Sequence, residues 1–115
     1  MAAVANFDIS TFEESARAVA EVLRMLSNER RLMILCRLVE RGEASVTTLG
    51  ADVGLSQSAL SQHLAKMRDK KLVTYRRQGQ TLWYRVCDSR VERLLSTLHD
   101  LYCSDDAIGQ SKGDH

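Results

Sequence analysis

The chain has 115 residues, 16 Lys and Arg against 15 Asp and Glu, three cysteines and no proline. This length suffices for one domain with a modest core and is too short for two independent cores. The N-terminal residues lack the basic flank and apolar run of a signal peptide, and no stretch approaches the length that spans a bilayer. We therefore expect a cytoplasmic protein with no membrane partner. Three cysteines in such a chain argue against a disulfide scaffold and leave buried, metal-binding or redox-active thiols.

The first forty residues predict two helices. The segment from Ser10 to Glu13 has the capping-box pattern, and apolar residues follow at helical spacing, which predicts a helix over about residues 11–26. A second helix is expected over about residues 28–40, with Gly42 ending it. The apolar residues on one side of this second helix are Leu32, Leu35, Cys36 and Val39.

The most informative segment predicts a short helix over residues 47–53, a tight turn at Gly54 and a longer helix over about residues 56–70. Ser56 can cap the longer helix, and a buried stripe follows at Leu60, Leu64 and Met67. The opposite face carries hydroxyls and carboxamides, which suit base edges and phosphates. This layout is typical of a helix-turn-helix that reads DNA.

A hairpin and a last helix complete the expected fold. Two stretches rich in β-branched and aromatic residues flank a Gln-Gly-Gln turn, which predicts a hairpin, or wing, over residues 73–86. A helix is expected over about residues 89–102, and its wide apolar face points to dimerisation. The chain should therefore form one mainly α winged helix-turn-helix domain over residues 1–103, homodimeric, with a disordered tail over residues 104–115.

Positive charge is concentrated in the candidate DNA-binding half. From Ser56 to Arg85 there are seven Lys and Arg and one Asp, which leaves a charge of +6, although the whole chain carries only +1. This charge could neutralise phosphates and release their counterions.

The order helix, helix, helix-turn-helix, hairpin, helix resembles the ArsR/SmtB family of bacterial winged-helix repressors. The segments LSNERRLMIL at residues 26–35 and LSQSALSQHL at residues 55–64 carry the likeness, which covers about residues 12–103. The resemblance implies a homodimer, built on the first and last helices, that binds an inverted repeat in double-stranded operator DNA and has no enzymatic activity. Two recognition helices would enter successive major grooves about 34 Å apart.

The resemblance also implies DNA contacts from the recognition helix and from the hairpin. The residues concerned are Gln57, Ser58, Ser61, Gln62, His63, Lys66, Arg76, Arg77 and Gln78. Gln62 is the best candidate for reading a base, because glutamine pairs bidentately with adenine. Ser58 and Ser61 suit phosphates instead. The alternative interpretations are a structural flank residue for His63 and a solvated hairpin tip for Arg76 and Arg77.

The metal-binding patterns of the family are absent from this sequence. The first helix of the helix-turn-helix contains no cysteine, and the last helix opens at Asp88 and offers His99 as its one histidine. A lone histidine and a lone aspartate cannot complete a tetrahedral or octahedral shell. We therefore expect neither a metal nor another cofactor.

Two cysteines stand in settings that resemble the sulfur-sensing branch of the family, Cys36 in ILCRL and Cys103 in LYC. The resemblance implies that persulfides or polysulfides link the two thiols, as a disulfide or through bridging sulfur, and so release DNA. By spacing alone, Cys36 would be a buried structural residue. Arg37 beside it could lower the pKa of the thiol, although neighbours on a helix point apart. Cys87 has no counterpart in the pattern and stays an alternative thiol partner.

Three other functions remain open. The runner-up is a metal- or arsenite-responsive repressor that uses cysteine thiolates, because arsenite accepts sites made only of thiols. A DNA-binding dimer without a sensor is another. A small thiol oxidoreductase is disfavoured, because it would normally carry a Cys-x-x-Cys motif.

Overall fold

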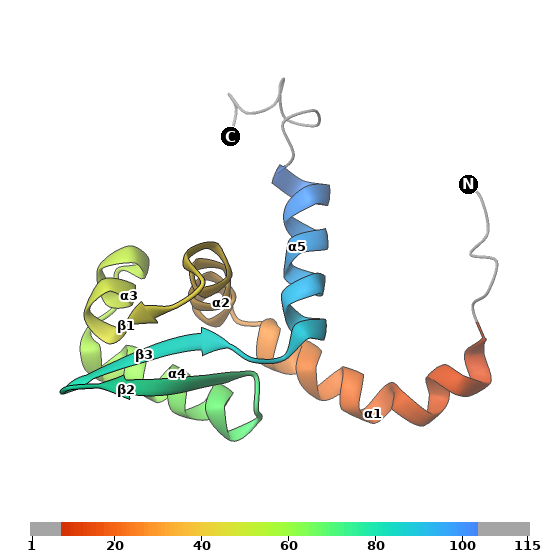
Figure 1. Ribbon diagram of the computed structural model, residues 1–115. Helices are drawn as coiled ribbons and strands as arrows, with labels where there is room; N and C mark the ends of the chain where they lie inside the picture. The colour runs from red at the N-terminus through yellow and green to blue at the C-terminus, as the bar shows by residue number, and fades with distance from the viewer. Residues whose placement is uncertain (1–7, 104–115) are drawn as a thin grey trace.

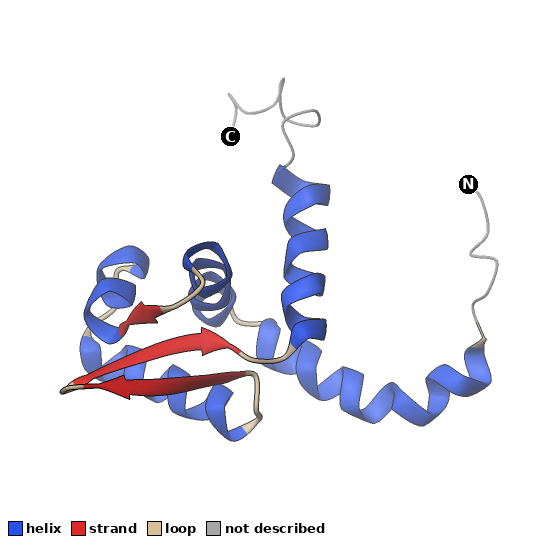
Figure 2. Ribbon diagram, viewed as in Figure 1, coloured by secondary structure: helices blue, strands red, loops and turns tan. Residues whose placement is uncertain are grey.

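The computed structural model describes residues 8–103. Figure 1 shows the elements in chain order, and Figure 2 shows the strands together in one sheet with helices around it. The elements are α1 (Ile9–Leu26), α2 (Glu29–Arg41), β1 (Ala44–Ser45), α3 (Val46–Val53), α4 (Gln57–Asp69), β2 (Val73–Gln78), β3 (Thr81–Val86) and α5 (Ser89–Cys103). The mainly α class with a hairpin wing is thereby confirmed. The tail expected to be disordered, residues 104–115, lies outside the described residues.

The helices begin at residues whose side chains accept a backbone N–H of the first turn, which has no partner within the helix. The caps of α2, α3 and α4 are Asn28, Ser45 and Ser56. Ser56 Oγ accepts the N–H of Ala59 at 3.1 Å, as the sequence predicts for the recognition helix.

The first helix begins earlier than the sequence suggests. Its cap is Asp8, whose carboxylate accepts the N–H of Ser10 at 3.1 Å and the hydroxyls of Ser10 and Thr11 at 2.8 and 3.0 Å. Ser10 therefore lies inside α1 and does not cap it. A carboxylate two residues upstream outcompetes the hydroxyl because it accepts several hydrogen bonds and complements the positive end of the helix.

The turn between α3 and α4 depends on glycine. Gly54 has a φ of 69° in the left-handed region, and its N–H donates to Gly50 O at 2.8 Å. A side chain at Gly50 would place its Cβ 3.1 Å from Leu55 O, so the two helices approach closely at this point. This local geometry fixes the angle at which α4 leaves the turn.

The sheet has the order β1-β3-β2 and is antiparallel throughout. Tyr75 pairs with Tyr84 in the hairpin, and Ala44 pairs with the other edge of Tyr84. The sequence did not predict β1, because a strand of two residues has no periodicity of its own. It exists through its pairing with β3.

The core is made by α2, α3, α4, the hairpin and the first turns of α5. In α2 the fully buried residues are Ile34, Leu35 and Leu38, all at 0% exposure. The predicted side is confirmed but incomplete, because Leu35 is buried and Leu32, Cys36 and Val39 pack partly buried against the core, whereas Ile34 and Leu38 were left out. The predicted stripe of α4 is confirmed, with Leu60, Leu64 and Met67 at 0, 1 and 0% exposure.

Helices α1 and α5 extend away from this core (Figure 1). Large apolar side chains on them are exposed, among them Leu23 at 50%, Leu101 at 66% and Tyr102 at 79%. A cavity of about 330 Å³ lies between the two helices. Dimerisation through these faces stays a prediction, and the exposed apolar area is consistent with it. No helix among residues 8–103 is both long and apolar enough to cross a membrane.

Replacing a core residue of α2 should destabilise the whole domain. Leu38→Ala removes a fully buried side chain, and we expect a loss of about 2–5 kcal/mol in the free energy of unfolding. The control is Met33→Ala on the same helix, where the side chain is 45% exposed and a change within about 0.5 kcal/mol is expected. Urea unfolding at one fixed protein concentration measures both. Equal losses would contradict the assignment of the core.

Candidate nucleic-acid interface and thiol pair

The outer face of α4 carries the polar residues that the sequence singles out. Gln57, Ser58, Ser61, Gln62 and Lys66 are all exposed. They stand opposite the buried stripe that holds the helix in place, so a rigid helix presents hydroxyls, carboxamides and one ammonium group together. Such a surface can donate to phosphates and to the acceptor atoms of bases.

His63 lies at the flank of α4 and is partly buried. Burial lowers the pKa of its imidazole, and the positive charges of Arg31, Lys66 and Arg30 lower it further. The ring is therefore neutral at neutral pH, so it can form a hydrogen bond but brings no charge to a phosphate. This position is compatible with both interpretations of His63 offered by the sequence.

The two arginines of the wing differ in their surroundings. Arg76 makes two contacts with the carboxylate of Glu43, at 2.7 and 3.1 Å, and donates to Gln78 Oε1 at 3.0 Å. Its guanidinium also lies 5.7 Å from the centre of the Trp83 ring. Within residues 8–103, Arg77 has no such hydrogen bond or ion pair, and it is exposed. Arg77 is thus available to an outside partner, whereas Arg76 and Gln78 are engaged within the chain.

Glu43 is a residue that sequence reasoning missed. Its pKa is lowered, first by the hydrogen bond from Arg76, so the ion pair persists at neutral pH. The two residues are 33 positions apart, and no local pattern connects them. The same is true of Arg41 and Asp52, which pair through two contacts of 2.6 and 3.0 Å and join the end of α2 to α3. The Arg41 hydrogen bond also lowers the pKa of Asp52.

Cys36 lies at a cavity of about 240 Å³ between α2 and α5. The lining residues are Cys36, Val39, Glu40, Leu95, Ser96 and His99. Burial raises the pKa of the Cys36 thiol, and the negative charge of a Cys103 thiolate raises it further. Arg37 does not lower this pKa, and its guanidinium instead donates to Glu40 at 2.8 Å, in line with the opposite directions of neighbouring helix residues.

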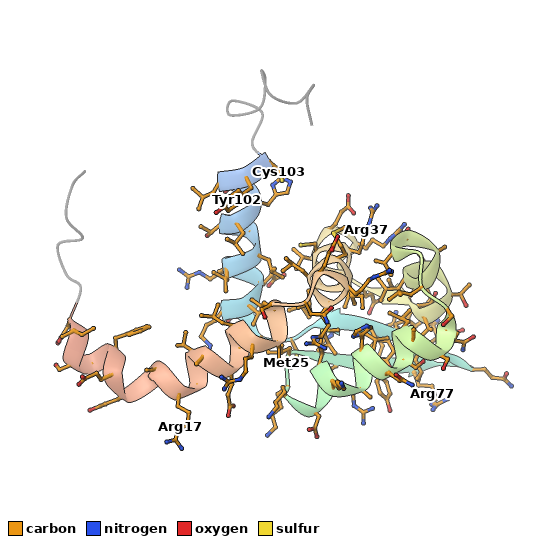
Figure 3. All side chains as sticks on the ribbon, turned by 180° about the vertical axis from the view of Figure 1, so that it is seen from behind. Arg17, Met25, Arg37, Arg77, Tyr102 and Cys103 are labelled. Carbon is orange, nitrogen blue, oxygen red and sulfur yellow. The ribbon has the colours of Figure 1, made fainter. Side chains whose placement is uncertain are left out.

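Cys103 ends α5, where Figure 3 shows it beside Tyr102, and it is exposed. Because its charge acts on Cys36, the two thiols lie within electrostatic range across the space between α2 and α5. The two residues lie on α2 and α5, the helices that line this cavity, although they are far apart in the sequence. All three cysteines are free thiols in this structure.

Cys87 lies elsewhere. It precedes the start of α5 by two residues, and its thiol donates to Lys71 O at 3.4 Å. The 15 residues of α5, at about 1.5 Å per residue, separate it from Cys103 by roughly 22 Å. The structure therefore does not bring Cys87 to the Cys103 thiol. Within the described part of the chain, no three His, Cys, Asp or Glu residues gather as a metal site.

Comparison with known proteins agrees with this architecture. The family model described as "Bacterial regulatory protein, arsR family" matches residues 28–75. The transcriptional activator HlyU of Vibrio cholerae is 40% identical over 99 residues, which cover 86% of this chain and 91% of HlyU.

Two solved structures have nearly the same fold. The transcriptional repressor BigR of Xylella fastidiosa superimposes with a TM-score of 0.79 and 35% identity, over 84% of this chain and 98% of that one. The antimony-specific transcriptional repressor AntR superimposes with a TM-score of 0.76 and 30% identity, over 91% of this chain and 92% of that one.

These relatives are regulators of transcription and not enzymes, and the family to which they belong binds operator DNA, typically as dimers. The identity to HlyU extends over nearly the whole of both chains, well beyond the helix-turn-helix. The chain therefore belongs to the ArsR family of bacterial regulatory proteins and is a winged-helix transcriptional regulator.

Proposed function

We propose that this regulator is a repressor that holds operator DNA while its thiols are reduced and leaves it when reactive sulfur species link Cys36 and Cys103. The observation that supports the proposal is the position of Cys36, which lines the cavity between α2 and α5, while Cys103 ends α5 and the charge of its thiolate acts on Cys36. Persulfides and polysulfides are the inducer class, since a thiolate attacks sulfane sulfur readily.

Two chains would bind an inverted repeat, joined through the apolar faces of α1 and α5. In each, Gln57, Ser58, Ser61, Gln62, His63 and Lys66 of α4 face the major groove, and the wing residues Arg76, Arg77 and Gln78 lie along the neighbouring backbone. The exposure of α4 supports the first group. Within the wing the structure favours Arg77 as the phosphate contact, while Arg76 keeps the strand in place through Glu43.

The different surroundings of the two cysteines give an order to the chemistry. Cys103 is exposed, so its thiolate attacks the sulfane sulfur of a persulfide RSSH first, and RS⁻ leaves. Cys36 is partly buried with a raised pKa, which suits the second step. Its thiolate attacks Cys103 Sγ, forms the disulfide and expels hydrosulfide. When Cys103 carries a longer chain, Cys103–Sγ–S–SH, attack of the Cys36 thiolate on the sulfur next to Sγ expels hydrosulfide and leaves one sulfur atom in the bridge.

The bond between Cys36 and Cys103 would affect the helix-turn-helix, α3 and α4, through α2. Its buried residues fix α2 in the core, and the Arg41–Asp52 pair joins its end to α3, which precedes the recognition helix. Tying α5 to α2 therefore constrains the dimer helix and the helix-turn-helix at once. A small change in the spacing of two recognition helices costs contacts on both half-sites.

The similarity to AntR favours one alternative, a repressor released by a trivalent metalloid bound to thiolates. It predicts stoichiometric binding of arsenite or antimonite by the reduced protein, and release of DNA without any bond between the cysteines. Mass spectrometry under denaturing conditions separates the two proposals, because only the sulfur mechanism leaves a covalent link.

A persulfide donor should weaken DNA binding of the wild type by roughly tenfold or more. A change of this size lies within the range of typical allosteric coupling free energies, about 1–3 kcal/mol. The measurement is fluorescence anisotropy with a duplex selected from a random pool by the reduced protein. Cys36→Ser and Cys103→Ser should bind as tightly as the wild type and not respond. Cys87→Ser is the matched control and should respond fully. A response that survives in Cys36→Ser would sink the proposal.

The order of the two steps can be read from trapped species. In Cys36→Ser, the donor should leave a persulfide on Cys103, because the exposed thiol reacts and the second step is blocked. In Cys103→Ser, modification of Cys36 should be much slower at neutral pH, since burial raises the pKa of that thiol. Peptide mass spectrometry after alkylation measures both. Faster modification of Cys36 would reverse the order.

Gln62→Ala should relax sequence discrimination. Loss of a bidentate contact with a base costs about 1–3 kcal/mol against the selected duplex and little against a scrambled one. Lys66→Gln is the comparison, because loss of a phosphate contact weakens binding to both duplexes alike. If Gln62→Ala lowers both affinities equally, Gln62 does not read a base.

A further inference from the structure

A basic cavity lies at the C-terminal end of α4, away from the tip of the β2–β3 hairpin (Figure 1). It measures about 340 Å³ and is lined by side chains from α1, α2 and α4, namely Glu21, Arg24, Met25, Arg31, Lys66 and Lys70. Apart from Lys66, none of these residues belongs to the DNA-contacting set that the sequence predicts. Four cations and one carboxylate line a hollow that is large enough for an anionic group.

The cavity continues the face of α4 that is expected to read DNA. Gln62, Lys66 and Lys70 are spaced four residues apart, so they form one stripe along the helix. The stripe begins at the candidate base reader and ends at the cavity. Figure 3 shows Arg77 and Met25 near opposite ends of α4, so the outer part of the wing and the cavity lie toward the two ends of the recognition helix.

Within residues 8–103, the four cations of the cavity face one carboxylate, Glu21, so a net positive charge remains. Within residues 8–103, Arg24, Lys66 and Lys70 form no ion pair. Arg31 donates its Nε–H to Met25 O at 2.8 Å, a contact that positions the guanidinium but leaves its charge uncompensated. The lowered pKa of the adjacent His63, caused partly by Arg31 and Lys66, is a separate sign of the positive potential.

We infer that this cavity holds a phosphate of the DNA backbone on the side of each half-site opposite to the wing. The major groove, about 12 Å wide, is bordered by two backbones. A recognition helix in it needs cationic contacts on both borders to fix its register, and the wing supplies only one. The inference rests on DNA binding by α4 but not on the thiol switch.

The test is the salt dependence of DNA binding by the reduced, full-length protein. Arg24→Gln/Lys70→Gln should weaken binding to selected and scrambled duplexes by the same factor, roughly fivefold or more. The slope of log K against log salt should become shallower by about 0.9 for each lost phosphate contact. Arg24→Lys/Lys70→Arg, which keeps the charge, should restore the wild-type slope.

The matched control is Arg17→Gln, which removes a charge from α1 two turns before Arg24, away from α4 (Figure 3). It should leave the slope unchanged. Glu21→Gln removes the one carboxylate of the cavity and should act in the opposite direction, giving tighter binding. Thermal melts confirm that each variant is folded.

Three results would overturn the inference. They are an unchanged slope in the double variant, an equal change in Arg17→Gln, or a loss of affinity that the charge-keeping variant does not restore. A wild type that binds no selected duplex would instead contradict the proposed function. The two failures are therefore distinguishable.

Discussion

The burial of α2 is the constraint on which the other features depend. Ile34, Leu35 and Leu38 are fully enclosed, so this helix cannot rotate or slide without opening the core. Cys36 follows Leu35 directly and therefore faces the border of the core, at the cavity beside α5. At its end the Arg41–Asp52 pair binds α2 to α3. One rigid helix thus contacts the candidate sensor on one side and the DNA-reading unit on the other.

Features set by neighbouring residues could be predicted from the sequence. Helical spacing gave the buried stripe of α4, and Ser56 marked its start, because both depend on contacts within a few residues. The exposed polar face of α4 follows from the same spacing. The resemblance of two short segments was enough to place the chain in its family.

Features that depend on distant residues could not be predicted. The strand β1 exists only through its partner Tyr84, and the pairing of Glu43 with Arg76 crosses 33 positions. The basic cavity is likewise assembled by three helices, and its cations look like ordinary surface residues in the sequence.

The last turn of α5 places Cys103 immediately after Leu101 and Tyr102, which are among the most exposed apolar side chains of the structure. If a second chain covers these two residues, the redox state of the thiols and the association of the chains share one short segment. Linkage then requires that each influence the other by the same free energy. Under the proposed thiol switch, the cellular concentration of the regulator would consequently set its threshold for reactive sulfur species, and its abundance would be part of the response.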